Sequence, residues 1–257
     1  MSEYHELEIS NGIARLCIVN AGVLNIVSSP VIIELTNAIN SLRERKDVRV
    51  LVLRGSGDRA FIGGADITEM AGLDGHTAQT FITRLAGLCD CLRRFPTPVI
   101  ARISGWCLGG GLEVAMACDL RVAAFDAQFG MPEVKVGIPS VIHAALMPRL
   151  IGVSRANWLL LTGQNIDARR AEAWGLVQSV CELAELDPRI DELAHTIAGF
   201  GPSAIQQQKA LLRAWEDVSI DSAVAATVPE FGRAFATGEP QHFMGEFLRA
   251  KSQKKKS

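Results

Sequence analysis

Three consecutive glycines (residues 109–111) stand just ahead of Glu113, which opens an apolar run in "LGGGLEVAMA". A phosphate-binding loop would need Lys and then Ser or Thr after its last glycine, and here Leu112 and Glu113 follow instead. A dinucleotide-binding turn would need a small residue where Val114 stands. The spacing therefore argues against phosphate binding by these glycines.

The glycines occupy a turn between a predicted strand and a predicted helix. Residues 98–104 ("PVIARIS") are typical of a buried strand, and the helix is expected to begin near Gly110 or Gly111. The first N–H groups of a helix have no intrahelical partner, and glycine exposes them without a blocking side chain. They could form an oxyanion hole, which stabilises charge developing on a carbonyl oxygen. The alternative is that the glycines only let the helix pack closely against the strand.

A second glycine turn lies upstream in "FIGGAD", where Gly63 and Gly64 precede Ala65 and Asp66. It follows the strand predicted at residues 48–55, and Asp66 is expected to cap the short helix behind it. Two glycine-rich strand ends of one parallel sheet would bring two N–H donors to one point. A pair of donors at one point is what an enolate oxygen needs.

The elements that must position these turns alternate between strands and helices. Ser28 or Ser29 is the expected cap of the first helix, with Pro30 in its first turn. Residues 141–152 predict a helix interrupted at Pro148. The alternation predicts an α/β core with parallel crossovers. Strands are predicted at residues 12–19, 48–55, 98–104, 120–125 and 175–181, and further helices at residues 29–45 and 78–95.

The bulk composition is that of a globular chain of 257 residues, with 48% hydrophobic residues and a formal net charge of −2. A net charge so close to zero does not attract the protein as a whole to nucleic acid or to an anionic membrane. The N-terminus does not resemble a signal peptide, and the apolar runs are too short to span a bilayer. The six cysteines form neither a secreted disulfide framework nor a zinc-ligand pattern. We therefore expect a cytoplasmic protein with no metal, nucleic-acid or membrane partner.

Three sequence blocks occur in order within residues 61–139: "FIGGAD", "PVIARISGWCLGGGLEVAMACDLRVA" and "AQFGMPEVKVGIP". Their order and spacing resemble the enoyl-coenzyme A hydratase (crotonase) superfamily, and a weaker similarity extends over nearly the whole chain. The resemblance implies an α/β fold, a crotonase-like spiral of ββα units with a C-terminal helical trimerisation region. It also implies that the N–H groups of Ala65 and Gly110 form an oxyanion hole, and that Glu113 and Glu133 are the catalytic carboxyl groups.

A hydratase of this family is a lyase that adds water across the 2,3 double bond of a 2-enoyl-CoA thioester. One carboxyl group would activate water for attack at C3, another would protonate C2, and the oxyanion hole would hold the enolate oxygen. No cofactor is expected, because coenzyme A is part of the substrate. Without the resemblance, both glutamates also have a non-catalytic explanation. Glu113 would stand in the first turn of its helix because the helix dipole favours an acid there, and Glu133 would be an exposed loop residue.

The resemblance also implies the residues that contact the acyl-CoA substrate. Arg59 is the expected partner of a phosphate or of the adenine, and Lys251 would assist from the last helix of a neighbouring subunit. The full expected set is Asn25, Arg59, Ala60, Gly63, Gly64, Asp66, Ile67, Gly109 and Lys251.

Other charged residues near these blocks are expected to be structural. Asp119 and Arg121 in "CDLRVA" would pair with each other at the turn between a helix and a strand. His143 lies close to the site in sequence, and on an apolar helix face it is expected to be a core or lining residue rather than a substrate contact.

The sequence departs from the family pattern in two places. Residues 20–22 read Asn-Ala-Gly where the family has Arg-Pro or Lys-Pro after the asparagine, so a cationic contact to coenzyme A is lost. Residues 138–145 ("IPSVIHAA") replace a glycine-rich helix start, and bulkier side chains should face the acyl pocket.

Three hypotheses follow from these features. In the first, the protein is a hydratase that uses both glutamates. In the second, it is an isomerase that works mainly through Glu133, or a hydrolase, of the same superfamily. In the third, it is a non-catalytic member that binds acyl-CoA or RNA. Retention of both glutamates favours the first hypothesis.

The chain ends in a helical section. We expect a spiral core over residues 1–194 and an oligomerisation region over residues 195–257, which would form homotrimers or dimers of trimers. The closing "KSQKKKS" predicts a solvated tail. The apolar residues that need a partner surface are Val224, Val228, Phe231, Phe235, Phe243 and Phe247.

Overall fold

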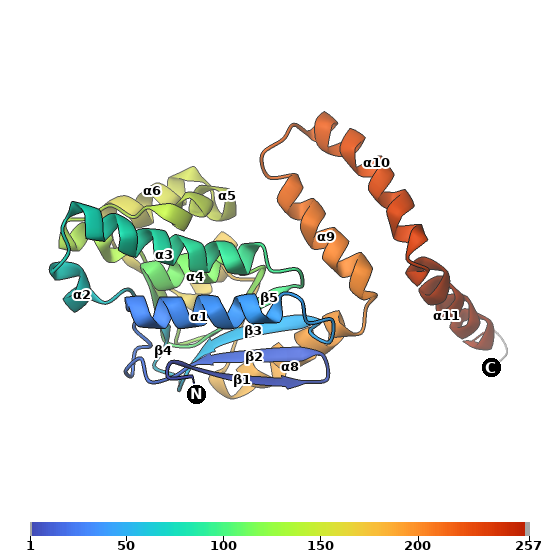
Figure 1. The fold of residues 1–257 in the computed structure, drawn as a ribbon, viewed down its shortest axis with the longest axis horizontal. Helices are drawn as coiled ribbons and strands as arrows, with labels where there is room; N and C mark the ends of the chain where they lie inside the picture. Colours follow the sequence, from blue (N-terminus) through green and yellow to red (C-terminus); the bar gives the residue numbers. More distant parts are fainter. Residues whose placement is uncertain (1, 255–257) are drawn as a thin grey trace.

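The computed structural model describes residues 2–254 and contains two β-sheets (Figure 1). The larger sheet has six strands in the order β1-β2-β3-β5-β7-β10, at His5–Ser10, Ile13–Ile18, Val50–Gly55, Val99–Ile103, Leu120–Ala124 and Ser179–Cys181. The smaller sheet has four strands in the order β4-β6-β8-β9, at Ala60–Ile62, Trp106–Leu108, Gln128–Gly130 and Asn165–Asp167. β1 and β9 run antiparallel to their neighbours β2 and β8, and the other paired strands are parallel.

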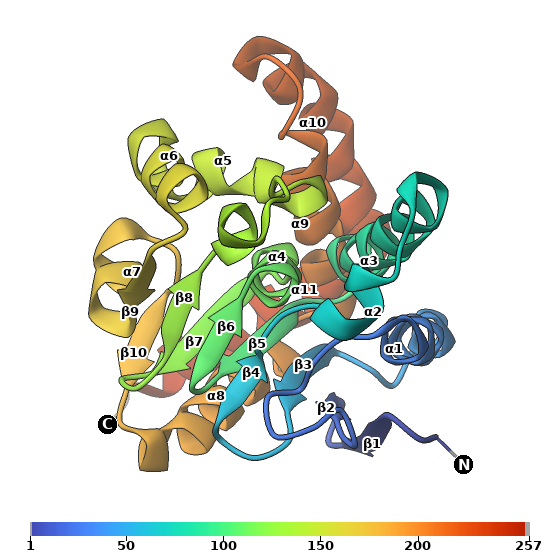
Figure 2. The same cartoon turned by 90° about the vertical axis from the view of Figure 1, so that its left-hand side faces the viewer.

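Successive turns of the chain give one strand to each sheet and then enter a helix. β3 and β4 lead to α2 (Ile67–Ala71) and α3 (Gly75–Arg93), and β5 and β6 lead to α4 (Gly110–Ala117). β7 and β8 lead to the 3-10 helices η1 (Pro132–Val136) and η2 (Ile142–Leu146). This is the expected spiral of ββα units. Figure 2 shows β4, β6 and β8 side by side, with α4 beyond their ends.

The middle strands of the larger sheet are buried on both faces. Leu51 and Leu53 of β3 face a core shared with α1 (Ser29–Leu42) and α3. Val50 and Val52 of the same strand pack against Leu186 of α8 (Leu183–Ala198), on the opposite face. Alternate residues of one strand thus bury apolar surface in two separate layers, which explains why this strand reads as a continuous apolar run. The helices between η2 and β10 are α5 (Met147–Ile151), α6 (Val153–Thr162) and α7 (Ala168–Trp174).

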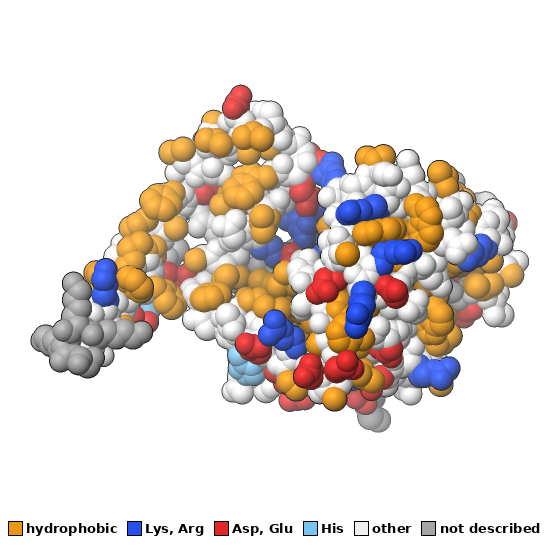
Figure 3. All heavy atoms as spheres, turned by 180° about the vertical axis from the view of Figure 1, so that it is seen from behind, with side chains coloured by type: hydrophobic (Ala, Val, Ile, Leu, Met, Phe, Trp, Pro, Cys, Tyr) orange, Lys and Arg blue, Asp and Glu red, His pale blue; other side chains and the backbone are white. Residues whose placement is uncertain are grey.

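The chain after α8 forms three further helices, α9 (Pro202–Ala214), α10 (Ile220–Ala236) and α11 (Glu239–Lys254). α9 is fastened to the core by the buried Lys209, whose Nζ lies 2.6 Å from Asp119 Oδ2. α10 and α11, which we call the C-terminal arm, lead away from the core (Figure 1), and hydrophobic side chains lie along them (Figure 3). All six apolar residues expected to need a partner surface are at least 38% exposed on this arm.

The predicted elements of the larger sheet are confirmed as β2, β3, β5, β7 and β10. α1 begins after Ser28 with Pro30 in its first turn, as expected. Pro148 stands in the first turn of α5, so it starts a helix rather than interrupting one. The expected domain boundary at residue 195 falls within α8, which packs on the sheet, and residues 255–257 of the basic tail lie outside the described residues. Within residues 2–254, no helix is long and apolar enough to cross a membrane.

Candidate active site

The two glycine turns follow adjacent parallel strands of the smaller sheet. Residues 63–65 leave β4 and residue 109 leaves β6, and these two strands pair directly. The carboxyl ends of parallel neighbours lie at the same edge, so the turns meet there. The two turns do follow parallel neighbouring strands, but the strands expected to precede them, at residues 48–55 and 98–104, were wrong: those belong to the larger sheet. The turns follow the three-residue strands β4 and β6 of the smaller sheet, which were not anticipated.

Each turn presents a backbone donor that the protein itself does not use. Gly63 and Asp66 donate their N–H groups to the carbonyls of residues 24 and 27, at 2.8 and 3.2 Å. Within residues 2–254, the N–H of Ala65 between them has no hydrogen-bond partner, nor does that of Gly110, the first residue of α4. These are the two donors expected to form the oxyanion hole.

Close packing brings the two turns together. A Cβ at Gly111 would overlap the carbonyl oxygen of Ile62, the last residue of β4, so only glycine lets α4 approach the strand this closely. A Cβ at Gly64 would lie 3.7 Å from the Leu108 carbonyl oxygen at the end of β6. The packing role and the donor role of the glycines therefore coexist in one turn.

Both turns open onto a cavity of about 750 Å³. Its wall includes Ala65 and Gly110 together with the side chains of Glu113 and Glu133. The rest of the wall is mostly apolar and comes from α2, α3 and the segment after Glu133. It includes Ile67, Met70, Leu73, Phe81, Ile82, Leu85, Val136, Ile138 and Val141.

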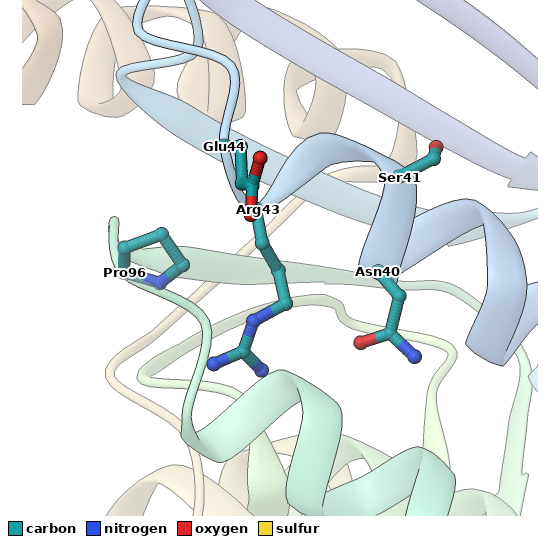
Figure 4. A pocket seen from close by; sticks show the side chains of 5 residues that line it. All are labelled: Asn40, Ser41, Arg43, Glu44 and Pro96. Atoms are coloured by element: carbon teal, nitrogen blue, oxygen red, sulfur yellow. The ribbon is translucent and has the colours of Figure 1, made fainter.

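A second hollow, of about 420 Å³, lies at the end of α1 (Figure 4). Asn40, Ser41, Arg43, Glu44 and Pro96 line it. Glu113, Glu133 and the two glycine turns line the first cavity and not this hollow, so the first cavity is the candidate active site.

Glu113 lies in the first turn of α4 and is 3% exposed. Its Oε1 accepts a 2.8 Å hydrogen bond from the backbone N–H of Ala144 on η2. Burial, with a smaller contribution from the charge of Glu133, raises the pKa of Glu113 to about 8 against the opposing effect of that hydrogen bond. Glu113 is therefore largely protonated at neutral pH.

Glu133 lies on η1 and faces the first residues of α4. Its Oε2 accepts a 2.9 Å hydrogen bond from Ser140 Oγ. Its Oε1 occupies the space beside Gly109, where an added Cβ would lie 2.5 Å from that oxygen. Gly109 also has a φ of +53°, which disfavours other residues. Burial raises the pKa of Glu133, while the Ser140 hydrogen bond lowers it.

The two glutamates form an unequal pair. Burial raises the pKa of both groups, and that of Glu113 reaches about 8. Two neighbouring carboxyl groups in different surroundings can divide the roles of acid and base between them.

The expected substrate contacts divide into those that line the cavity and those that do not. Gly63, Gly64, Ile67 and Gly109 line it. Asp66 caps α2 by accepting hydrogen bonds from the N–H groups of residues 68 and 69, as expected of a cap.

Asn25 and Ala60 are fully buried and outside the cavity wall. Asn25 Nδ2 donates to the carbonyl oxygens of Ser56 and Ala60, so its side chain holds this loop together. Arg59 and Lys251 are exposed, on the chain before β4 and on α11. Neither belongs to the cavity wall, and their contacts with coenzyme A stay predictions.

The expected pairing of Asp119 with Arg121 is wrong. Asp119 instead pairs with Lys209 at 2.6 Å and Arg213 at 2.8 Å, and accepts the N–H of Val99. Arg121 donates to three backbone carbonyl oxygens around the end of α4. Both residues are structural, but Lys209, Arg213 and Leu176 lie too far away in sequence to be inferred as their partners.

His143 packs toward α3 and not toward the cavity. Its Nε2 lies 3.4 Å from Asp90 Oδ1, and its side chain is 12% exposed. This agrees with the expected core role. Sequence reasoning did not identify Ser140 and Ala144 as partners of the glutamates, although the departure of residues 138–145 from the glycine-rich pattern marked their segment.

Comparison with known proteins agrees with this geometry. The family model described as enoyl-CoA hydratase/isomerase matches residues 8–253. The chain is 35% identical over 243 residues to a crotonyl-CoA hydratase of Syntrophomonas wolfei, covering 94% of each protein. It is 33% identical over 243 residues to a short-chain-enoyl-CoA hydratase of Clostridium acetobutylicum, covering 94% of this chain and 93% of that one.

Solved structures show the same similarity. The crystal structure of an enoyl-CoA hydratase from Bacillus anthracis matches with a TM-score of 0.93 at 28% identity, covering 96% of both chains. With the spiral of ββα units, the paired glycine turns and the match along the chain, this protein belongs to the enoyl-CoA hydratase/isomerase family.

Proposed function

We propose that the protein is an enoyl-CoA hydratase, which adds water across the 2,3 double bond of a 2-enoyl-CoA thioester. The observation that carries the proposal is the placement of a buried carboxyl group, Glu113, and a half-buried one, Glu133, in one cavity wall with two unused backbone N–H donors. The names of the relatives from S. wolfei and C. acetobutylicum support the same reaction.

In the proposed reaction, one of the two carboxyl groups is neutral and the other is ionised. The thioester oxygen accepts hydrogen bonds from Ala65 and Gly110, which polarises the double bond. A water molecule held between Glu113 and Glu133 attacks C3 and gives a proton to the ionised carboxylate. The neutral carboxyl group gives a proton to C2 of the enolate. The reverse reaction, elimination of water, exchanges the two roles.

The cavity wall also fits an acyl chain. Its apolar residues come mainly from α3 and from the segment after Glu133, which surround the glutamates. Apolar walls stabilise the acyl group by burial and exclude bulk water, which strengthens the hydrogen bonds to the enolate oxygen. Coenzyme A enters as part of the substrate, and Arg59, exposed just before β4, is our candidate for its phosphates.

The test follows hydration of crotonyl-CoA by the loss of its conjugated enoyl-thioester absorbance. Wild type should turn over, and Glu113→Gln and Glu133→Gln should each lose roughly 10²-fold or more in kcat, the usual contribution of a general acid or base. Glu182→Gln, which removes an exposed carboxyl group beside α8, is the matched control and should retain full activity.

Other outcomes distinguish the alternatives. Isomerisation of a 3-enoyl-CoA that survives Glu113→Gln but not Glu133→Gln would replace the hydratase with an isomerase. Release of free coenzyme A would indicate a hydrolase. Binding of acyl-CoA without any turnover would indicate a non-catalytic member.

We also propose that the protein self-associates as a trimer or a dimer of trimers through the C-terminal arm. The arm carries an exposed apolar surface, with Val228 70% and Phe231 71% exposed, and such surfaces mark protein contacts. Light scattering at micromolar concentration should give at least the trimer mass, and a monomer would refute the proposal.

A further inference from the structure

We propose that Ser140 is a positioning residue, which holds the Glu133 carboxylate in the orientation used for proton transfer. The inference deepens the proposed hydratase function and rests on it. Ser140 touches Glu133 rather than the reacting atoms, so it acts through that carboxylate.

A hydrogen bond holds one oxygen of the Glu133 carboxylate and leaves the other oxygen available for proton transfer. Ser140 Oγ lies 2.9 Å from Oε2 of Glu133 and donates to it. Oε1 lies beside Gly109, next to the N-terminus of α4 that supplies one oxyanion donor. Rotation of the carboxylate about its last side-chain bond would break the Ser140 hydrogen bond. The hydroxyl therefore selects one orientation of Glu133.

The segment that carries Ser140 supports both glutamates. Four residues further on, the N–H of Ala144 donates to Glu113 at 2.8 Å. Between the two donors, Ile142 has a φ of +43°, an uncommon conformation for a β-branched residue, and the backbone is strained there. The segment thus fixes the positions of the two carboxyl groups relative to each other.

The surroundings of Glu133 leave Ser140 as its side-chain hydrogen-bond donor within the described chain. The charged and titratable groups of the same cavity wall are Glu113 on α4, Lys135 on η1 and Asp74 before α3. Helix α6 packs against η1, but its Arg155 contacts Trp174 and not Glu133. Removing the hydroxyl should therefore both loosen Glu133 and make it harder to ionise.

The experiment compares wild type with Ser140→Ala and Ser140→Thr in crotonyl-CoA hydration across pH. Because Ser140→Ala loses a hydrogen bond to a charged group, its kcat should fall by roughly 10-fold or more, while its KM should change by less than about 3-fold. The acidic limb of kcat/KM should move about one to two pH units upward, since the carboxylate loses the donor that favours its charged form. Ser140→Thr keeps the hydroxyl and should restore both values.

The matched control is Val141→Ala, on the same segment and also in the cavity wall. It should change KM and the preference for acyl chain length, while the acidic limb stays in place. If Ser140→Ala moves neither kcat nor the acidic limb, or if Val141→Ala moves the limb equally, Ser140 has no positioning role.

A second measurement separates this inference from the proposed reaction. Carboxyl ¹³C NMR of the protein with labelled glutamate, with Glu133 assigned from the signal lost in Glu133→Gln, reports its titration without turnover. The Glu133 signal should titrate at higher pH in Ser140→Ala than in wild type, and an unchanged titration would refute the inference. Loss of hydration in wild type, with the NMR shift present, would instead refute only the proposed function.

Discussion

Glu113 should destabilise the folded protein above acidic pH, because the site holds its carboxyl group where ionisation is unfavourable. Its folded-state pKa of about 8 lies above the ordinary value of 4.5, so the folded protein binds more protons than the unfolded chain between these values. Stability therefore falls as pH rises through this window and levels off above the folded-state pKa.

The magnitude follows from the size of the shift. At 1.36 kcal/mol per pKa unit, the penalty that develops between about pH 5 and about pH 9 amounts to about 4 kcal/mol. Glu113→Gln removes the titration, while its amide oxygen can still accept the N–H of Ala144. The variant should gain about that much free energy of unfolding relative to wild type as the pH is raised, although it loses activity.

Urea denaturation at fixed protein concentration, repeated across pH, measures this difference. The quantity to compare is the variant minus wild type at each pH, which cancels the other titrating groups to first order. Glu182→Gln, at the surface, supplies the control for removal of a carboxyl group. Parallel stability curves for wild type and Glu113→Gln would show that the Glu113 carboxyl group is not shifted by burial, and the acid–base assignment of the pair would fail.

Three further predictions concern other parts of the structure. In wild type, kcat/KM for hydration should decline above about pH 8 as Glu113 loses its proton, and an alkaline limb that does not depend on Glu113 would contradict this. Gly109→Ala places a Cβ 2.5 Å from Glu133 Oε1 at a positive φ, so kcat should fall roughly 10²-fold; wild-type kinetics would show that the carboxylate does not need this position. Lys209→Met leaves Asp119 with Arg213 as its remaining cation and should lower the free energy of unfolding by about 3 kcal/mol, measured by denaturation, whereas a change below about 1 kcal/mol would show that the ion pair does not fasten α9.

The features predictable from sequence were those encoded by local patterns. The long apolar strands, the start of α1 after Ser28 and the two glycine turns each depend on a few adjacent residues, and the structure contains all of them, although the Ser28 side chain makes no capping hydrogen bond. The smaller sheet was missed because strands of three residues, such as β6, are too short to show an alternating pattern.

Contacts between distant segments were not predictable. Lys209 reaches Asp119 across 90 positions, and no pattern within α9 distinguishes that lysine from an exposed one. Ser140 and Glu133 are only seven residues apart, yet their hydrogen bond depends on how η1 turns the chain back toward α4. For such residues, function is set by the path of the backbone, which composition and spacing do not record.

The glycine triplet has a consequence for how this enzyme can evolve. A methyl group at each position would collide with a different element: Glu133 of η1 at Gly109, Leu85 of α3 at Gly110, and Ile62 of β4 at Gly111. A substitution at any one of these glycines would therefore need a compensating change in a separate segment. The apolar cavity wall, built from independent side chains, can change one residue at a time. The lining of the cavity should therefore drift readily among descendants of this protein, while the glycine turn stays constant.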